Sequence, residues 1–85
     1  MLPFLLEEKK MLIGLNIGYY RRARHITQIE LAEMLNISSN YLSQVERGCK
    51  CLSLDKLLEL AAVWEVDEKE FLDFSKLPIF ARDLR

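Results

Sequence analysis

The chain has 85 residues, of which 51% are hydrophobic, and its formal net charge is −1. This length suits one small domain with a single core, and the near-zero charge argues against a protein that binds polyanions over its whole surface. No segment reaches the roughly 18 apolar residues that span a bilayer, and the apolar start is too short for a secretory signal, so we expect a cytoplasmic protein without membrane contact.

Charge is distributed unevenly along the chain. Residues 1–50 carry seven basic and five acidic residues, a net charge of +2, whereas residues 51–85 carry five basic and eight acidic residues, a net charge of −3. One half of the chain can therefore face an anion while the other half is kept away from it.

The first predicted helix starts at Leu12 and runs to about Arg24, because apolar residues recur there at helical spacing. Residues 1–11 are expected to form an N-terminal extension. Gly14 and Gly18 lie four residues apart on one face of the helix, where the lack of a side chain permits a neighbouring element to approach closely.

Two short helices are predicted next, with almost no linker between them. Thr27 opens the helix over residues 28–35 with a capping box, in which its side chain accepts from the amide three residues on and Glu30 reaches back. Asn36 ends that helix, because Asn takes the left-handed backbone conformation more readily than most residues. A serine then caps the third helix, over residues 38–46.

Two further helices complete the prediction. Ser53 is placed to cap a helix over residues 54–64, and Asp67 to begin a fifth helix that runs to Phe74. The tail over residues 75–85 contains a proline and is expected to be extended or irregular, and it is a candidate for part of a dimer contact. Because no strand alternation is visible, the predicted fold class is all-α.

The segment from Thr27 to Gly48 reads TQIELAEMLNISSNYLSQVERG, and its two helices around a tight turn are typical of a helix-turn-helix. Together with Arg21 and the SL pair at residues 53–54, this segment resembles the Cro / phage-repressor-like (Xre) family of bacterial and phage transcriptional regulators. The similarity covers about residues 12–74. It implies a five-helix phage-repressor-like domain with the helix-turn-helix at helices 2 and 3, which binds double-stranded DNA as a homodimer.

The resemblance implies that the helix over residues 38–46 is the recognition helix, which enters the major groove. Asn and Gln side chains can bond bidentately to adenine, and Ser can bond several base edges. No Arg or Lys lies inside this helix, so we expect an operator with important A·T pairs. The expected base-reading residues are Ser39, Asn40, Ser43 and Gln44.

The resemblance also implies contacts to phosphate and a structural ion pair. The start of the second helix touches phosphate in the family, and basic residues on either side of the recognition helix supply further contacts that hold register without reading sequence. Arg21 and Glu46 occupy positions that the family often pairs. The expected phosphate-binding residues are Gln28, Arg22, Arg24, Arg47 and Lys50.

The sequence departs from the family at His25, where glycine is common, so the first helix is expected to end without its usual left-handed glycine. The dimer surface is expected to be apolar and distant from the recognition helix, on the last two helices. The residues assigned to it are Trp64, Val66, Phe71 and Phe74.

Other kinds of site have little support. Cys49 and Cys51 flank Lys50, but a structural metal site usually needs four converging ligands, and a disulfide between these two cysteines would be strained. We see no catalytic motif, so neither an enzyme, a metal nor a cofactor is predicted. A second hypothesis stays open: a protein-interaction module of antitoxin or adaptor type, which uses the same fold and the apolar ends MLPFLL and LPIF to bind a protein partner.

Overall fold

A computed structural model describes residues 6–73 and residue 75. Within these ranges the chain forms α-helices and one short 3-10 helix but no strand, which confirms the all-α fold class. None of the described helices is long and apolar enough to cross a membrane. The elements are α1 (Leu6–Ala23), α2 (Gln28–Leu35), α3 (Ser39–Glu46), α4 (Leu54–Trp64) and the 3-10 helix η1 (Glu68–Leu72).

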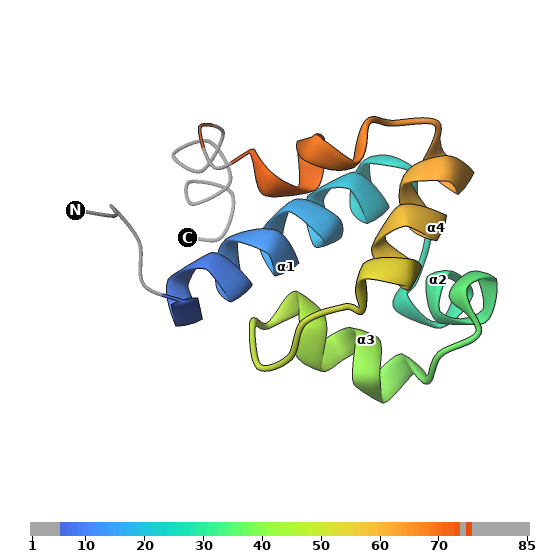
Figure 1. The fold of residues 1–85 in the computed structure, drawn as a ribbon. Helices are drawn as coiled ribbons and strands as arrows, with labels where there is room; N and C mark the ends of the chain where they lie inside the picture. The colour runs from blue at the N-terminus through green and yellow to red at the C-terminus, as the bar shows by residue number, and fades with distance from the viewer. Residues whose placement is uncertain (1–5, 74, 76–85) are drawn as a thin grey trace.

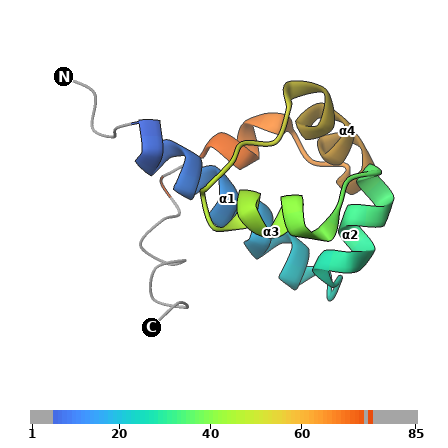
Figure 2. The same cartoon turned by 90° about the horizontal axis from the view of Figure 1, so that it is seen from below.

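Helix α1 is the central element of the fold. In Figure 1 it runs through the middle of the molecule, with α3 below it and η1 above it, and it contacts both. Helices α2 and α4 contact each other at the end of the molecule where α1 finishes. Seen from below in Figure 2, α3 crosses in front of α1, so one side of α3 is covered and the opposite side faces outward.

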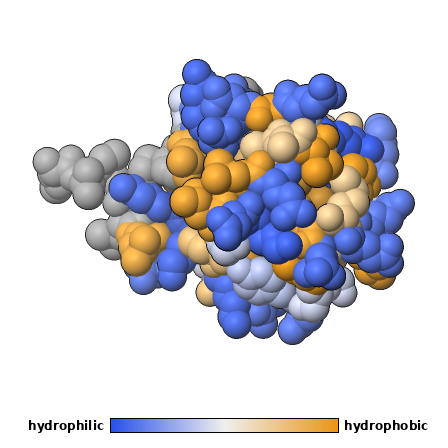
Figure 3. All heavy atoms as spheres, turned by 45° about the vertical axis from the view of Figure 1, so that its right-hand side comes forward, coloured by the Kyte–Doolittle hydropathy of each residue, from blue (hydrophilic) through white to orange (hydrophobic). Residues whose placement is uncertain are grey.

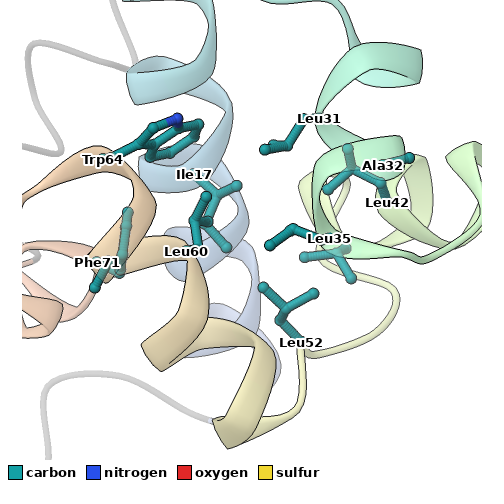
Figure 4. Packing of buried hydrophobic residues seen from close by; sticks show 11 residues of the cluster. Ile17, Leu31, Ala32, Leu35, Leu42, Leu52, Leu60, Trp64 and Phe71 are labelled. Carbon is teal, nitrogen blue, oxygen red and sulfur yellow. The ribbon is translucent and has the colours of Figure 1, made fainter.

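Every helix contributes to one hydrophobic core (Figure 4). The aromatic part of this core is built around η1, where the Phe71 ring lies 5.8 Å from the Tyr20 ring, edge to face, and 6.1 Å from the Trp64 ring. Complete burial of a large apolar side chain contributes about 1.5–3 kcal/mol. The large apolar side chains without exposed surface are Ile17, Leu31, Leu35, Leu42, Leu60 and Phe71.

Helix α1 starts earlier than its sequence pattern predicts. It begins at Leu6 rather than Leu12, and Glu7 and Glu8 occupy its first turn, where acidic side chains interact favourably with the positive end of the helix dipole. Its first half also packs against the loop after α3, because a side chain at Gly48 would meet the backbone of Met11. Residues 6–11 are therefore part of the folded domain.

The predicted caps of α2 are present. The Thr27 hydroxyl accepts a hydrogen bond from the Glu30 amide at 3.1 Å, and the Glu30 carboxylate accepts one from the Thr27 amide at 2.9 Å. The bond from the Thr27 amide, followed by that involving the Thr27 side chain, lowers the pKa of Glu30 below its ordinary value of 4.5. Asn36 ends the helix with φ at 55°, in the left-handed region. Both local predictions are confirmed.

Helix α1 ends in a left-handed residue although that residue is not glycine. His25 has φ at 57°. Its amide donates to the Arg22 carbonyl at 3.0 Å, and the Ile26 amide donates to the Arg21 carbonyl at 3.3 Å, which is the Schellman pattern. The family's usual turn is therefore kept, and a histidine carries the conformational cost of the positive φ.

The predicted fifth α-helix is wrong in type and length. Asp67 caps the segment as expected, accepting from the Lys69 amide at 3.0 Å, but only the short η1 follows it. The buried Asn16 amide of α1 donates to the Phe71 carbonyl at 2.9 Å and to the Asp73 carbonyl at 3.3 Å. These bonds satisfy carbonyl groups at the end of η1 and hold it against α1. Phe74 lies outside the described residues.

Candidate nucleic-acid interface

Helices α2 and α3 form a compact pair joined by residues 36–38. The Ser38 side chain caps α3 by accepting from the Tyr41 amide at 3.0 Å. Helix α3 buries only Leu42 and Val45, so only one edge of this short helix packs on the core. The side of α3 opposite this edge faces outward.

The four expected base-reading residues lie on α3 away from the core. Ser39 and Asn40 are exposed, and Ser43 and Gln44 are partly exposed. Across the part of the chain that the structure describes, none of these four side chains has a hydrogen-bond partner. Their donors and acceptors are therefore available to a ligand.

The predicted ion pair between Arg21 and Glu46 is present. Arg21 Nε lies 2.8 Å from one carboxylate oxygen of Glu46 and Arg21 Nη2 lies 3.1 Å from the other, a bidentate arrangement. The two side chains are only 12% and 8% exposed. Arg21 also donates to the Ile26 carbonyl at 2.8 Å, so it joins α1 to the end of α3 and to the turn before α2.

Gln28 extends this network. Its side-chain amide donates to the Glu46 carboxylate at 3.1 Å, from the first position of α2. Glu46 thus accepts hydrogen bonds from both α1 and α2. In this structure Gln28 fixes the start of α2 against the end of α3, and its expected contact to phosphate stays a prediction.

Arg24 contacts aromatic side chains and backbone carbonyls within the chain. Its guanidinium carbon lies 4.8 Å from the centre of the Trp64 ring and 5.5 Å from that of the Tyr20 ring. It also donates to the Tyr20 carbonyl at 3.1 Å and to the Trp64 carbonyl at 3.4 Å. Arg24 therefore ties the end of α1 to the end of α4, and its expected contact to phosphate stays a prediction.

Three of the expected phosphate-binding side chains remain exposed: Arg22, Arg47 and Lys50. Arg47 reaches back along α3 to the Ser43 carbonyl at 3.4 Å. The loop that carries Lys50 is pinned to the same helix, because the Gln44 carbonyl accepts from the amides of Cys49 at 2.8 Å and of Lys50 at 3.3 Å. Arg47 and Lys50 thus lie at the C-terminal end of α3.

Comparison with known proteins shows which family has this sequence pattern. A family model described as "Helix-turn-helix" matches residues 17–71, well over half of the chain. The chain belongs to the helix-turn-helix family. This membership confirms the resemblance to Cro / phage-repressor-like (Xre) regulators.

Named relatives of this helix-turn-helix protein fall into two size classes. It is 36% identical over 62 residues to the HTH-type transcriptional regulator RamB of Mycobacterium tuberculosis, a match that covers 73% of this chain but only 13% of RamB. It is 28% identical over 69 residues to the control protein C.BamHI of Bacillus amyloliquefaciens, covering 80% of this chain and 85% of that relative. The chain therefore spans a small part of RamB and most of C.BamHI.

A solved structure supports the same fold. The restriction-modification controller protein C.AhdI from Aeromonas hydrophila aligns with a TM-score of 0.67 at 27% sequence identity. The alignment covers 73% of this helix-turn-helix chain and 94% of C.AhdI.

The expected dimer surface needs correction. Phe71 has no exposed surface and Trp64 is only 8% exposed, and both lie in the core of a single chain, so they cannot form an interface without unfolding. Val66 is partly buried against the same core, and Phe74 lies outside the described residues. These aromatic residues look like interface residues in sequence because nothing local distinguishes core packing from surface packing.

Exposed apolar side chains lie elsewhere on the last long helix. Leu54 is 68% exposed and Leu58 is 42% exposed, and with the exposed Ala62 they repeat every four residues along one edge of α4. Figure 3 shows the side of the molecule that carries α4 and α2, where apolar patches alternate with hydrophilic ones. We call Leu54, Leu58 and Ala62 the α4 stripe.

Sequence reasoning missed two polar residues that fix neighbouring segments of the fold. Asn16 holds η1, and the one signal for it was a polar residue within the apolar stripe of α1. Tyr41 of α3 donates from its hydroxyl to the Cys51 carbonyl at 2.6 Å and so fixes the loop after α3. No local pattern in the sequence predicts that bond.

Proposed function

We propose that this helix-turn-helix protein is a sequence-specific DNA-binding transcriptional regulator. The observation that carries the proposal is the outward face of α3, whose four polar side chains are unpaired within the described chain and are supported by a rigid network behind them. Its relatives, a transcriptional regulator, a control protein and a restriction-modification controller protein, support the same function.

In this proposal α2 and α3 are the helix-turn-helix, and α3 enters the major groove. Asn40 and Gln44 each present an amide that can donate to and accept from one adenine, and Ser39 and Ser43 supply single bonds to neighbouring base edges. The Glu46 network behind them fixes α3 relative to α1 and α2. The side chains proposed to contact bases are therefore held in one orientation relative to the DNA. A rigid scaffold of this kind limits the loss of conformational entropy on binding.

Affinity in this proposal comes mainly from phosphate contacts. Arg22, Arg47 and Lys50 are the exposed basic candidates, together with the positive N-terminal end of α2 at Gln28. So few charges give one protomer weak binding and a shallow dependence on salt. Two protomers on a pseudo-palindromic operator would double the number of phosphate contacts, and with it the slope of the salt dependence. This is the reason to propose a homodimer.

The α4 stripe replaces the buried aromatic residues as the proposed dimer surface. In a two-fold symmetric dimer the same patch meets its own copy, and an apolar stripe along one helix is complementary to itself. The acidic second half of the chain, which contains α4, also suits a surface that is turned away from DNA.

The decisive experiment selects bound fragments from randomised DNA at near-physiological salt and sequences them. A two-fold motif with adenines in each half-site is the expected result. Gln44→Ala should then reduce discrimination at one position of each half-site by about 1–3 kcal/mol, whereas Glu59→Ala on the surface of α4 should leave the selected motif unchanged. Unaltered selectivity in Gln44→Ala would remove this residue from the reading set. Absence of any enriched motif would favour the protein-interaction alternative, in which the fold binds a partner protein.

A further inference from the structure

The loop over residues 47–53 joins α3 to α4 and carries the exposed Lys50. Packing fixes both ends of this loop. A Cβ atom at Gly48 would lie only 2.8 Å from the Cα atom of Met11, so the loop backbone touches α1 there. At the other end Leu52 is 8% exposed and belongs to the core. The position of Lys50 therefore depends on the bonds that hold the middle of the loop.

Two anchors on α3 hold the middle of the loop. The Gln44 carbonyl accepts from the amides of Cys49 at 2.8 Å and of Lys50 at 3.3 Å, so two donors share one acceptor and the bond from Lys50 is the longer. On the other side of Lys50, the Tyr41 hydroxyl donates to the Cys51 carbonyl at 2.6 Å, a short bond between two oxygen atoms. Tyr41 and Gln44 are three residues apart and are neighbours on the surface of α3. The loop therefore lies along the edge of α3 that carries Gln44.

We propose that Tyr41 is a positioning residue for DNA binding, whose hydroxyl holds the loop so that Lys50 meets the phosphate beside the base that Gln44 contacts. This inference rests on the proposed function, in which Lys50 binds phosphate. Within the described part of the chain the Lys50 ammonium forms no ion pair, so no carboxylate competes with the phosphate. Tyr41 itself does not touch DNA; it acts through Lys50.

The contribution of Tyr41 is entropic. A lysine strengthens binding only by what remains after its own segment of backbone has been ordered. Without the hydroxyl, the Cys51 carbonyl can turn away from α3, and Lys50 must be ordered anew at each binding event. Helix α3 keeps its cap at Ser38 and its buried side chains in that case. Loss of the hydroxyl should therefore weaken binding without changing which DNA sequence is preferred.

The test is a double-mutant cycle on the selected DNA. Affinity is measured at several salt concentrations for the wild type, Tyr41→Phe, Lys50→Gln and the protein with both substitutions. Tyr20→Phe is the matched control, because the Tyr20 hydroxyl donates to the Glu70 carboxylate at 3.4 Å, between α1 and η1. Thermal unfolding of each variant shows that the proteins compared are folded.

We expect Tyr41→Phe to lower affinity by about fivefold at low salt, the equivalent of one net hydrogen bond. The loss should shrink as salt rises, because salt weakens contacts between lysine and phosphate. In the Lys50→Gln protein the same substitution should change nothing, and Tyr20→Phe should bind as the wild type does. An equal loss with and without Lys50 would mean that Tyr41 acts on α3 or on DNA directly, and would overturn the proposal. So would no loss at all, or a changed sequence preference.

A measurement without DNA separates this inference from the proposed function. Amide hydrogen exchange is followed by NMR in the wild type and in Tyr41→Phe. We expect the amides of Cys49 and Lys50 to exchange several-fold faster in the variant, while those of Leu42 and Arg47, bonded along α3, keep their rates. Unchanged exchange in the loop, with DNA binding by the wild type intact, overturns this inference and leaves the proposed function standing. A wild type that binds no DNA refutes the proposed function and the role of Lys50 together, even if faster exchange shows that Tyr41 anchors the loop.

Discussion

Glu46 illustrates how single residues set the geometry of the interface. Its carboxylate accepts from Arg21 in α1 and from Gln28 in α2, so one side chain at the end of α3 joins three helices. The pair is largely screened from solvent, which means that removal of one partner leaves the other charge poorly solvated.

Glu46→Ala should lower the free energy of unfolding by about 3 kcal/mol, because Arg21 would be left partly buried without its counter-ion. Urea denaturation followed by circular dichroism would measure this. The exposed pair of Lys56 and Glu59, whose charged atoms lie 3.4 Å apart, provides the control: Glu59→Ala should cost less than about 1 kcal/mol. Similar losses in the two variants would contradict the special role of Glu46.

His25 offers a gain in stability at a single position. Its φ of 57° is strained for a residue with a Cβ atom, and glycine removes that strain. His25→Gly should therefore raise the free energy of unfolding by about 0.5–1 kcal/mol, after the extra freedom of glycine in the unfolded chain is counted. His25→Ala keeps the strain and serves as the control. A glycine variant no more stable than the alanine variant, by thermal unfolding, would refute this account.

At the scale of elements, the approach of α1 to α3 depends on Gly14. A Cβ atom built there would collide with the backbone carbonyl of Val45, whereas one at Gly18 would meet only the ends of the Arg22 and Glu46 side chains. The sequence predicted a close approach on this face, and the structure shows that Gly14 is where backbone meets backbone.

Gly14→Ala should destabilise the protein by about 1–3 kcal/mol, because the overlap with a rigid carbonyl outweighs the roughly 1 kcal/mol that alanine gains in helix propensity. Gly18→Ala is the matched comparison and should cost less, since the exposed Arg22 side chain can move away and the Glu46 carboxylate, 3.1 Å from the added atom, is approached less closely than the Val45 carbonyl is at Gly14. Chemical denaturation of both variants decides the matter. A larger loss at Gly18 would show that the close contact lies elsewhere.

The elements that could be predicted from sequence are those set by local chemistry. Thr27 with Glu30, and Asn36, act within a few residues of themselves, so the start and end of α2 follow directly from sequence. The conformation of residues 68–73 depends instead on Asn16, more than fifty residues earlier in the chain, whose side-chain amide donates to the carbonyls at the end of η1. A local pattern therefore predicted an α-helix where a long-range contact stabilises a short 3-10 helix.

The candidate site likewise contains features that could be predicted from the sequence and features that could not. The resemblance to a known family placed the polar face of α3 and the pairing of Arg21 with Glu46, because both depend on register within a familiar motif. It could not show that Arg24 stacks on Trp64, since that contact depends on how the ends of α1 and α4 meet. Aromatic residues were assigned to a surface for the same reason.

At the scale of the whole molecule, the proposed function requires the DNA interface and the α4 stripe to serve one symmetric assembly. Leu58→Lys places a charge in the middle of the stripe without disturbing the core, because Leu58 is already 42% exposed. We expect this variant to sediment as a monomer where the wild type sediments as a dimer, and to bind the full operator more weakly while keeping its fold.

Val63→Lys is the control for this prediction. Val63 lies on α4 and is 46% exposed, but it is outside the α4 stripe. The Val63→Lys substitution should leave the proposed dimer intact. A wild-type protein that is monomeric at high concentration, or a Leu58→Lys protein that remains dimeric, would rule out the stripe as the contact between copies.

The unpaired side chains of α3 have a consequence for how this protein can change. Helix α3 has eight residues; Leu42 and Val45 are buried in the core and Glu46 joins the network, while Ser39, Asn40, Ser43 and Gln44 have no hydrogen-bond partner in the described chain. Substitutions at those four positions should alter which DNA is preferred while leaving unfolding nearly untouched, provided that they keep good helix formers. Preference can then drift to a new target in single steps, each of which passes through a folded protein.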